Sequence, residues 1–363
     1  MNVEKLTCIH FRNYEFMSFS FASDCIHFFY GKNAQGKTNL IEAIYFLSHL
    51  RSFRTNQLSS MVMDGHDNFC VQASIESCHR KEELKVVVNN QKKHLFRFDN
   101  PVKKYSDFIG IENAILFCPD DLNLFSQSPK YRRRFVDMEL MKISKTYTNT
   151  LSKYQKLLKE RNQTLKSDKV DSFLLDIYLD QMIETQIVII QQRNQFILEL
   201  MDKARELYPF FSDKEERIDA KYETFIELEG DMRVHMKEAY KKYLNRELLY
   251  HQTLIGVHRD DIVFELNGKN VNEIASQGQK RSFLLALKLG LTQILFEKTK
   301  QYPILLLDDV FSELDDTRKI QLLNRLPRNM QIFITTTEKI DREWNRPVRF
   351  YDIENGKIKE ALR

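Results

Sequence analysis

Cysteine, tryptophan and glycine are scarce in this chain of 363 residues, which also lacks any long apolar run. The five cysteines are odd in number and include no Cys-x-x-Cys pair, which argues against a zinc site and is typical of reduced cytoplasmic thiols. No segment reaches the roughly 18 consecutive apolar residues of a membrane span, and no small-residue cleavage site follows an apolar core near residue 1. We therefore expect a cytoplasmic protein without a membrane partner.

A large net charge is also absent, because 55 Lys and Arg residues are opposed by 51 Asp and Glu residues, which leaves +4. So small an excess does not by itself indicate nucleic-acid binding. Residues 129–161 differ, with ten basic and three acidic residues, and their densest part is Arg132-Arg133-Arg134. This stretch is either a solvated helical face or a surface that contacts phosphate, and we predict that the arginine triplet contacts DNA phosphates.

Glycine is nearly missing from the middle of the chain, where Gly230 is the only one between residues 111 and 255. Long glycine-poor stretches rich in Leu, Lys, Glu and Gln favour helix. Apolar residues recur at helical spacing over 173–207, and a helix over 153–165 could pair with that segment in the antiparallel direction. We expect an all-helical lobe over residues 119–250.

The flanking regions carry strand patterns instead. Residues 26–30, 304–307 and 331–335 are continuous apolar runs, as expected for strands of a sheet that is covered on both faces. We therefore expect an α/β domain formed by residues 1–118 together with 251–363, into which the helical lobe is inserted.

A complete phosphate-loop motif, G-x-x-x-x-G-K-[ST], follows the first of these apolar runs and precedes a helical stretch over 39–47. Strand, glycine loop and helix is the arrangement that makes such a match specific. Backbone N–H groups of the loop can point at phosphate oxygens, Lys37 should reach the β- and γ-phosphates, and Thr38 should ligate Mg²⁺. The chain is therefore expected to bind ATP or GTP through Gly31, Lys32, Asn33, Ala34, Gln35, Gly36, Lys37 and Thr38.

The metal-holding half of such a site is predicted by residues 304–309, where four apolar residues precede Asp308 and Asp309 in the Walker B pattern. Two adjacent buried carboxylates repel each other and are expected mainly beside a cation. We expect Asp308 to orient the Mg²⁺ shell. We expect Asp309 to polarise the attacking water near the γ-phosphate and, with Lys37, to be catalytic.

Two further motifs resemble those of the ABC-type ATPases. Ser276-Gln277-Gly278-Gln279 precedes a long apolar helix and resembles their signature loop, and Ser312-Glu313-Leu314-Asp315 resembles their D-loop. In that superfamily the signature loop of one subunit closes on the γ-phosphate held by another. The resemblance implies that Ser276, Gln277, Gly278 and Gln279 contact nucleotide across a dimer interface, which Asp315 would also cross. A hydroxyl and a helix start suit an anion.

Among ABC-type families the chain resembles the RecF family over nearly its whole length, from about residue 3 to about residue 340. The stretches that carry the resemblance are 11–14 (Phe-Arg-Asn-Tyr), 31–43, 51–55 (Arg-Ser-Phe-Arg-Thr), 117–122 (Phe-Cys-Pro-Asp-Asp-Leu), 132–135 (Arg-Arg-Arg-Phe) and 256–261 (Gly-Val-His-Arg-Asp-Asp). The resemblance implies an ABC-type ATPase head, related to the heads of chromosome-maintenance ATPases, with an inserted helical lobe and no long coiled coil.

The RecF resemblance implies a function as well. The family dimerises on ATP with Mg²⁺, binds single- and double-stranded DNA at gaps in replication and recombinational repair, and separates after slow hydrolysis. Its members act with RecO and RecR and help the RecA recombinase to load. Arg51 and Arg54 follow the phosphate-loop helix and are expected near DNA or a partner subunit. We predict that they contact DNA together with the arginine triplet.

Other interpretations of the ABC-type motifs have less support. A transporter subunit would carry His after the strand that follows Walker B, where this chain has Thr335-Thr336-Thr337, and no glutamine loop is evident. A chromosome-organising ATPase would need a long heptad arm, and a nuclease would need an additional acidic metal cluster. Arg12 is either a nucleotide contact or one partner of an ion pair, and His258 is expected to pack in the interior or at an interface.

Overall fold

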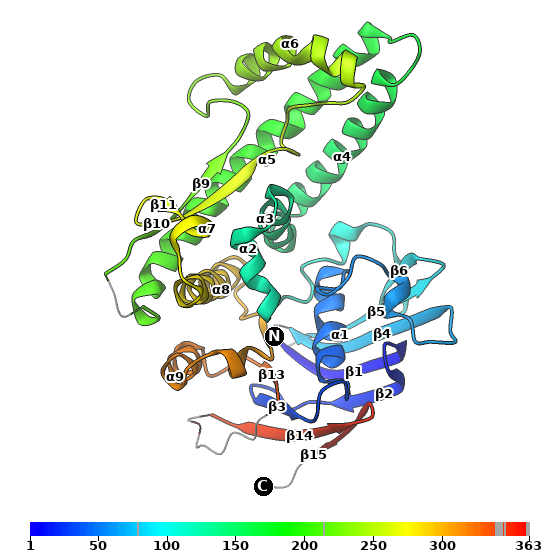
Figure 1. Ribbon diagram of the computed structural model, residues 1–363. Coiled ribbons are helices and arrows are strands. Elements are labelled where there is room, and N and C mark those ends of the chain that lie inside the picture. Colours follow the sequence, from blue (N-terminus) through cyan, green and yellow to red (C-terminus); the bar gives the residue numbers. More distant parts are fainter. Residues whose placement is uncertain (78–79, 213–214, 338–343, 345, 361–363) are drawn as a thin grey trace. The chain divides into compact units, whose positions relative to one another are not determined.

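The computed structural model describes residues 1–77, 80–212, 215–337, 344 and 346–360, which form two compact units (Figure 1). The first unit contains Met1–Asp121 and Leu284–Arg363, and the second contains Leu122–Phe283. Among the helices that the structure describes, none is both long and apolar enough to cross a membrane.

A six-stranded sheet in the order β15-β14-β3-β13-β12-β8 forms the centre of the first unit. Its strands are β3 (Ile26–Tyr30), β8 (Ala114–Phe117), β12 (Ile304–Asp308), β13 (Ile332–Thr336), β14 (Val348–Glu354) and β15 (Lys357–Glu360). From β14 to β8 the neighbouring strands run parallel. Every residue of β3, β8, β12 and β13 is buried, which explains their continuous apolar runs and confirms the predicted α/β class.

The second sheet of this unit is antiparallel, in the order β2-β1-β4-β5-β6-β7. Its strands are β1 (Asn2–Phe11), β2 (Tyr14–Ser20), β4 (Asn68–Ser77), β5 (Arg80–Asn89), β6 (Lys92–Arg97) and β7 (Asn100–Val102). Helix α1 (Lys37–His49) packs against β12 and β13 on one side and against β4 on the other, so it lies between the two sheets. Its phosphate-loop end is therefore fixed by both.

Shorter elements complete the first unit. They are η1 (Ser59–Met61), η2 (Tyr105–Asp107), η5 (Val310–Glu313) and α9 (Asp316–Arg325), with η3 (Pro119–Leu122) at the boundary with the second unit. Helix α8 (Gln277–Thr299) begins in the second unit and ends in the first.

The second unit is built mainly on helices. They are α2 (Asn123–Ser126), α3 (Pro129–Ile143), α4 (Lys145–Leu165), α5 (Ser172–Leu207), α6 (Met232–Tyr250) and α7 (Val271–Ile274), with η4 (Tyr208–Phe210) directly after α5. Helices α4 and α5 pack against each other along their length, as the predicted helices over 153–165 and 173–207 require (Figure 1).

The expectation of an all-helical lobe over 119–250 was incomplete. Strand β9 (Ile218–Glu223) lies inside that range and pairs antiparallel with β10 (Asp261–Leu266), which in turn pairs with β11 (Lys269–Asn270). The strand that β9 needs comes after α6, so the compact unit extends to Phe283 rather than ending at residue 250. A short strand whose partner is distant in sequence has no local signal.

The segment from Thr253 to Asp260 is largely buried in the second unit, apart from exposed Arg259, and is held by buried polar groups. The Arg193 side chain is 2% exposed; it donates to the Val257 carbonyl oxygen at 2.8 Å and pairs with Asp137 at 2.9 Å and Asp260 at 3.3 Å. A buried guanidinium is tolerated because its donors are met in this way. The network ties α3 and α5 to the segment that leads into β10.

His258 has a packing role in the same segment. The Tyr154 hydroxyl lies 2.6 Å from its Nδ1, and its Nε2 lies 3.4 Å from the Thr253 carbonyl oxygen. Burial lowers the pKa of His258 to about 4, so the ring is neutral near pH 7. The expectation of an interior histidine agrees with this position.

Gly256 is the tightest point of the segment. Its φ is 128°, and a Cβ placed there would lie 2.7, 2.8 and 2.9 Å from the side-chain oxygens of Gln186, Tyr240 and Tyr154. Gly268, in the turn between β10 and β11, also has a positive φ of 74° but finds no described atom within 4 Å of such a Cβ. A side chain at Gly256 would therefore meet both crowding and backbone strain, whereas a side chain at Gly268 would meet backbone strain alone.

Gly256→Ala is expected to lower the free energy of unfolding by roughly 2–5 kcal/mol, because overpacking of about 1–3 kcal/mol adds to about 1–2 kcal/mol of left-handed strain. Gly268→Ala should cost only the strain. Urea denaturation of both variants measures the difference. Equal destabilisation of the two would show that the pocket around Gly256 is not closely packed.

Candidate nucleotide-binding site

The phosphate loop has the backbone conformation that its glycines permit. Gly31 has a φ of 151° and Gly36 a φ of 115°. A Cβ at Gly31 would collide with the carbonyl oxygen of Ile353 on β14, and one at Gly36 would lie 2.9 Å from Asn13 Nδ2. Side chains are therefore excluded at both positions, and the loop can curl tightly between β3 and α1.

Lys37 folds back into this loop. Its Nζ donates to the carbonyl oxygens of Gly31 at 2.6 Å and Lys32 at 3.0 Å, and the residue is 4% exposed. Burial lowers the pKa of Lys37, and the nearby carboxylates of Asp309 and Asp308 act in the opposite direction. An ammonium held at the centre of the loop can exchange these carbonyl oxygens for phosphate oxygens.

Three side chains meet at the carboxyl edge of the parallel sheet. Thr38 Oγ1 donates to Asp308 Oδ1 at 3.0 Å, and Thr335 Oγ1 donates to the same oxygen at 2.7 Å. The Asp309 N–H donates to Thr335 Oγ1 at 3.1 Å, so Thr335 bridges both acids. Strand β13 lies between β3 and β12, which is why its last residues reach both halves of the site.

Asp308 is in an environment that suits a cation. Burial raises its pKa to about 6; the Asp309 charge adds to this effect, whereas the hydrogen bonds from Thr335 and Thr38 oppose it. A hard divalent cation takes oxygen ligands and would stabilise the ionised form. The Thr38 hydroxyl and the Asp308 carboxylate are therefore the residues that could hold Mg²⁺.

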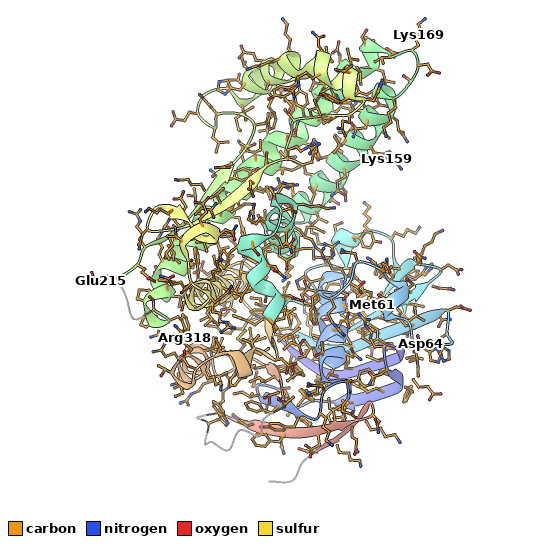
Figure 2. All side chains as sticks on the ribbon, in the orientation of Figure 1. Met61, Asp64, Lys159, Lys169, Glu215 and Arg318 are labelled. Atoms are coloured by element: carbon orange, nitrogen blue, oxygen red, sulfur yellow. The ribbon has the colours of Figure 1, made fainter. Side chains whose placement is uncertain are left out.

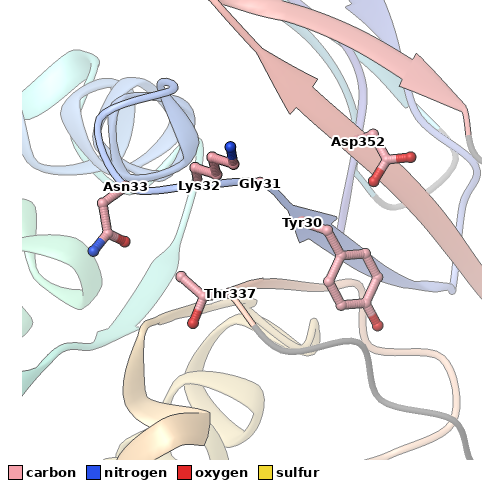
Figure 3. Close-up of a pocket in the computed structure, with 6 residues that line it drawn as sticks. All are labelled: Tyr30, Gly31, Lys32, Asn33, Thr337 and Asp352. Carbon is pink, nitrogen blue, oxygen red and sulfur yellow. The ribbon is translucent and has the colours of Figure 1, made fainter.

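A pocket of about 600 Å³ opens beside the loop (Figure 3). It is lined by Tyr30, Gly31, Lys32, Asn33, Thr337 and Asp352. The loop residues come from the end of β3, Thr337 follows β13, and Asp352 belongs to β14, so the pocket lies at the same strand ends as the acids. Its volume is in the range of small-molecule sites.

The predicted signature loop belongs to the second unit, where it forms the start of α8. The N–H of Gln279 donates to Ser276 Oγ at 3.2 Å, and the N–H of Ser276 donates to Gln279 Oε1 at 2.7 Å. This reciprocal pair is a capping box, which satisfies two N–H groups at a helix start. A Cβ at Gly278 would meet, within 4 Å, only Ser276 Oγ at 3.9 Å among the described atoms.

Asp315 of the predicted D-loop caps helix α9. Its Oδ1 accepts a hydrogen bond from the Arg318 N–H at 2.8 Å, and its carboxylate pairs with the Arg318 guanidinium. These interactions lower the pKa of Asp315. Within this chain the residue is a helix cap, and its expected position across a dimer interface stays a prediction.

The arginine triplet occupies a different environment from the one predicted. Arg132 Nε and Nη2 donate to the two oxygens of Asp261 at 2.7 and 2.8 Å, and Arg133 donates to the carbonyl oxygen of Asp260. These bonds fasten α3 to the start of β10. A phosphate that contacts Arg132 or Arg133 would compete with these partners, and DNA contacts by Arg132, Arg133 and Arg134 stay predictions.

Exposed basic residues of the same stretch lie at the start of α3, where Lys130 is exposed, and along α4. Lys153, Lys156 and Lys159 are exposed there, and Figure 2 shows Lys159 on the outer side of the helix. In the first unit, Arg54 is 43% exposed and donates to Asn39 Oδ1 on α1 at 2.9 Å. DNA contacts by Arg54 and Arg51 stay predictions.

Glu42 is a residue of the site region that the sequence analysis missed. Its fully buried carboxylate on α1 accepts two hydrogen bonds from Arg12, at 2.9 and 2.6 Å, and one from Ser52. Arg12 is thus one partner of an ion pair, the second of the two alternatives. Thr335 was noted only for not being histidine, and its position at the end of a buried strand was the available signal.

Comparison with known proteins places the chain in a family. Residues 2–359 match the model of the RecF/RecN/SMC N-terminal domain. A DNA replication and repair protein RecF from Halalkalibacterium halodurans is 37% identical over 370 residues, which cover 99% of this chain and 100% of that protein. One from Ligilactobacillus salivarius is also 37% identical, over 99% of this chain and 98% of that protein.

The chain belongs to the RecF family. A solved structure described as the recombination mediator protein RecF with ATP in the RecFOR pathway matches 99% of this chain and 97% of that chain, with a TM-score of 0.92 and 31% identity. The Smc head domain from Pyrococcus furiosus, at 15% identity and a TM-score of 0.54, shares the fold of this family more distantly. The predicted RecF resemblance is confirmed.

Thr335→Val is expected to weaken Mg²⁺-dependent ATP binding roughly tenfold, because a hydrogen bond to a charged group contributes about 1.5–3 kcal/mol and 1.4 kcal/mol is tenfold in affinity. The valine keeps the shape of the side chain and removes the hydroxyl that bridges Asp308 and Asp309. Calorimetric titration with ATP in Mg²⁺ and in EDTA tests this. An equal loss of ATP affinity in EDTA would show that Thr335 does not act through the metal.

Proposed function

We propose that this protein is an ATP-dependent DNA-binding switch of the RecF type. Two copies join when ATP and Mg²⁺ bind, the joined form binds DNA at gaps in replication and recombinational repair, and slow hydrolysis releases it. The observation that carries the proposal is the meeting of Thr38, Asp308 and Thr335 beside a phosphate loop, in a chain whose family includes a structure solved with ATP.

The roles of the residues follow from their positions. Lys37 and the backbone N–H groups of residues 31–38 bind the phosphates, while Thr38 and Asp308 hold Mg²⁺, which when bound offsets charge on the β- and γ-phosphate oxygens. Asp309 follows directly at the strand end with a φ of 53°, and its carboxylate accepts a proton from, or orients, the attacking water. Hydrolysis is therefore assigned to Asp309, with Lys37 stabilising the charge that develops.

Gly278 supports a site shared between two copies. Glycine in the first turn of a helix costs roughly 0.5–1 kcal/mol relative to alanine. The described part of the chain supplies no crowding that would require it there. A Ser276 hydroxyl and a bare backbone at a helix start suit close approach of a phosphate from a second molecule. The predicted contacts of Gln277 and Gln279, and of Asp315, belong to the same proposal.

The DNA and protein partners come from the family. Contacts to phosphate would give low sequence specificity and a steep dependence on salt. By membership of the RecF family we propose that the protein acts in the cytoplasm with RecO and RecR and helps the RecA recombinase to load.

Sedimentation with and without ATP and gapped DNA tests the proposal. Lys37→Ala should abolish ATP binding and leave the protein monomeric at any ATP concentration. Asp309→Asn should bind ATP and accumulate as the dimer, because hydrolysis no longer separates the copies. An Asp309→Asn protein that stays monomeric in saturating ATP and Mg²⁺ would contradict the switch.

Gly278→Ala is expected to weaken ATP-dependent association without lowering the free energy of unfolding. The free energy of unfolding should rise or stay level, by up to about 1 kcal/mol, because alanine stabilises a helix when its backbone fits. Association in ATP should fall at least tenfold, because the added methyl group occupies the space of the phosphate. Retained association would show that Gly278 does not approach a nucleotide.

A further inference from the structure

A single carboxylate connects the signature loop to the end of the longest helix of the second unit. Gln279 Nε2 donates to Glu216 Oε1 at 2.7 Å. The other oxygen, Oε2, accepts from the Tyr208 hydroxyl at 2.6 Å and from Ser212 Oγ at 3.0 Å. Glu216 lies between η4 and β9, and its carboxylate has donors on both oxygens.

The Glu216 carboxylate and the Ser276 backbone together hold both ends of the Gln279 side chain. The side-chain amide of Gln279 has two ends: Oε1 accepts the Ser276 N–H at 2.7 Å, and Nε2 is held by Glu216. The backbone N–H of Gln279 donates to Ser276 Oγ at 3.2 Å. Because Ser276 Oγ is the acceptor in that bond, its own hydrogen remains available to donate to an anion.

The segment that carries Glu216 is itself fastened to α8. Ser282 Oγ donates to the Phe211 carbonyl oxygen at 2.6 Å, and the ring of buried Tyr208 lies 6.2 Å from that of Phe283. Tyr208 follows directly on α5, whose 36 residues span roughly 54 Å at 1.5 Å per residue. The first turns of α8 and the end of α5 are thus joined by polar and ring contacts.

We propose that Glu216 is a positioning residue for the shared nucleotide site. It fixes Gln279, and through the capping box it fixes Ser276, in the arrangement that closes on the triphosphate held by a second copy of the chain. Tyr208 supports it from the end of α5, which makes the signature loop dependent on the position of that helix. This inference rests on the proposed function.

Glu216→Gln is the direct test, because three donors among the described residues, namely Tyr208, Ser212 and Gln279, converge on a carboxylate that has only acceptors. An amide N–H must then face either Gln279 Nε2, whose bond would be lost, or the hydroxyls of Tyr208 and Ser212, which would have to accept. In both cases Gln279 loses a charge-assisted bond. ATP-dependent association, measured by sedimentation, should weaken about tenfold. The ATP affinity of the monomer should stay at the wild-type value, since the phosphate loop belongs to the first unit.

Glu215→Gln is the matched control. Glu215 is the neighbouring residue and is exposed (Figure 2), and its substitution removes the same charge. It should associate as the wild type does. An equal loss of association in Glu215→Gln would assign the effect to net charge and overturn the proposal.

A second readout examines the loop itself. Hydrogen exchange of the Ser276 and Gln279 amides in the nucleotide-free protein should be faster in Glu216→Gln than in Glu215→Gln, because their acceptors belong to the box that Glu216 holds. Tyr208→Phe keeps the ring and removes one donor, so its association constant should lie between those of the wild type and Glu216→Gln. If Glu216→Gln does not fold, Tyr208→Phe decides the question, and wild-type association there overturns the proposal.

The reference variant Ser276→Ala distinguishes a failure of the proposed function from a failure of the role assigned to Glu216. Wild-type protein that does not associate in ATP, or Ser276→Ala protein that associates normally, contradicts the proposed function. Association that needs Ser276 and persists unchanged in Glu216→Gln contradicts only the role of Glu216.

Discussion

Two segments that are 270 positions apart in the chain, those of Thr38 and Asp308, share one hydrogen bond at the carboxyl edge of a parallel sheet. The order of the strands in the first unit brings these two residues together. Strand β3 delivers the phosphate loop, β12 delivers the acids, and β13 lies between them and adds Thr335. Burial raises the pKa of Asp308 to about 6, so the ionised site gains stability when a cation offsets its charge.

The parts of the site that depend on local chemistry could be predicted from the sequence. The glycines and Lys37 have a fixed spacing because one loop must surround a phosphate, and Asp308 follows four apolar residues because a buried strand must deliver it. The order of strands has no such local signal. It was therefore β13, known from the sequence only as an apolar run, that supplied Thr335 to the two acids.

The sequence was least informative where a partner is distant along the chain. Arg132 lies in a dense basic run, which predicted a DNA-contacting surface; Asp261, 129 positions further on, pairs with it, and a DNA contact by Arg132 stays a prediction. Strand β9 was taken into an all-helical lobe because its partner β10 follows another helix. The role of Glu42 could not be predicted for the same reason, since a single acid in a helix does not indicate that it will pair with Arg12.

The second unit contributes a helix start to the proposed site. Ser276 and Gln279 satisfy each other's N–H groups, Glu216 holds the remaining end of Gln279, and Gly278 leaves the first turn bare. Such a helix start suits an anion. The composite site that we propose brings it against the triphosphate held by the phosphate loop of a second copy.

Mixing two variants that are each unable to associate tests this claim most directly. One chain carries Lys37→Ala with its signature loop intact, and the other carries Ser276→Arg with its phosphate loop intact. In a mixed pair, one composite site contains both defects and the other contains none. We expect ATP-dependent association between differently labelled chains that neither variant shows alone. A mixture that associates no better than its separate components would contradict a shared site.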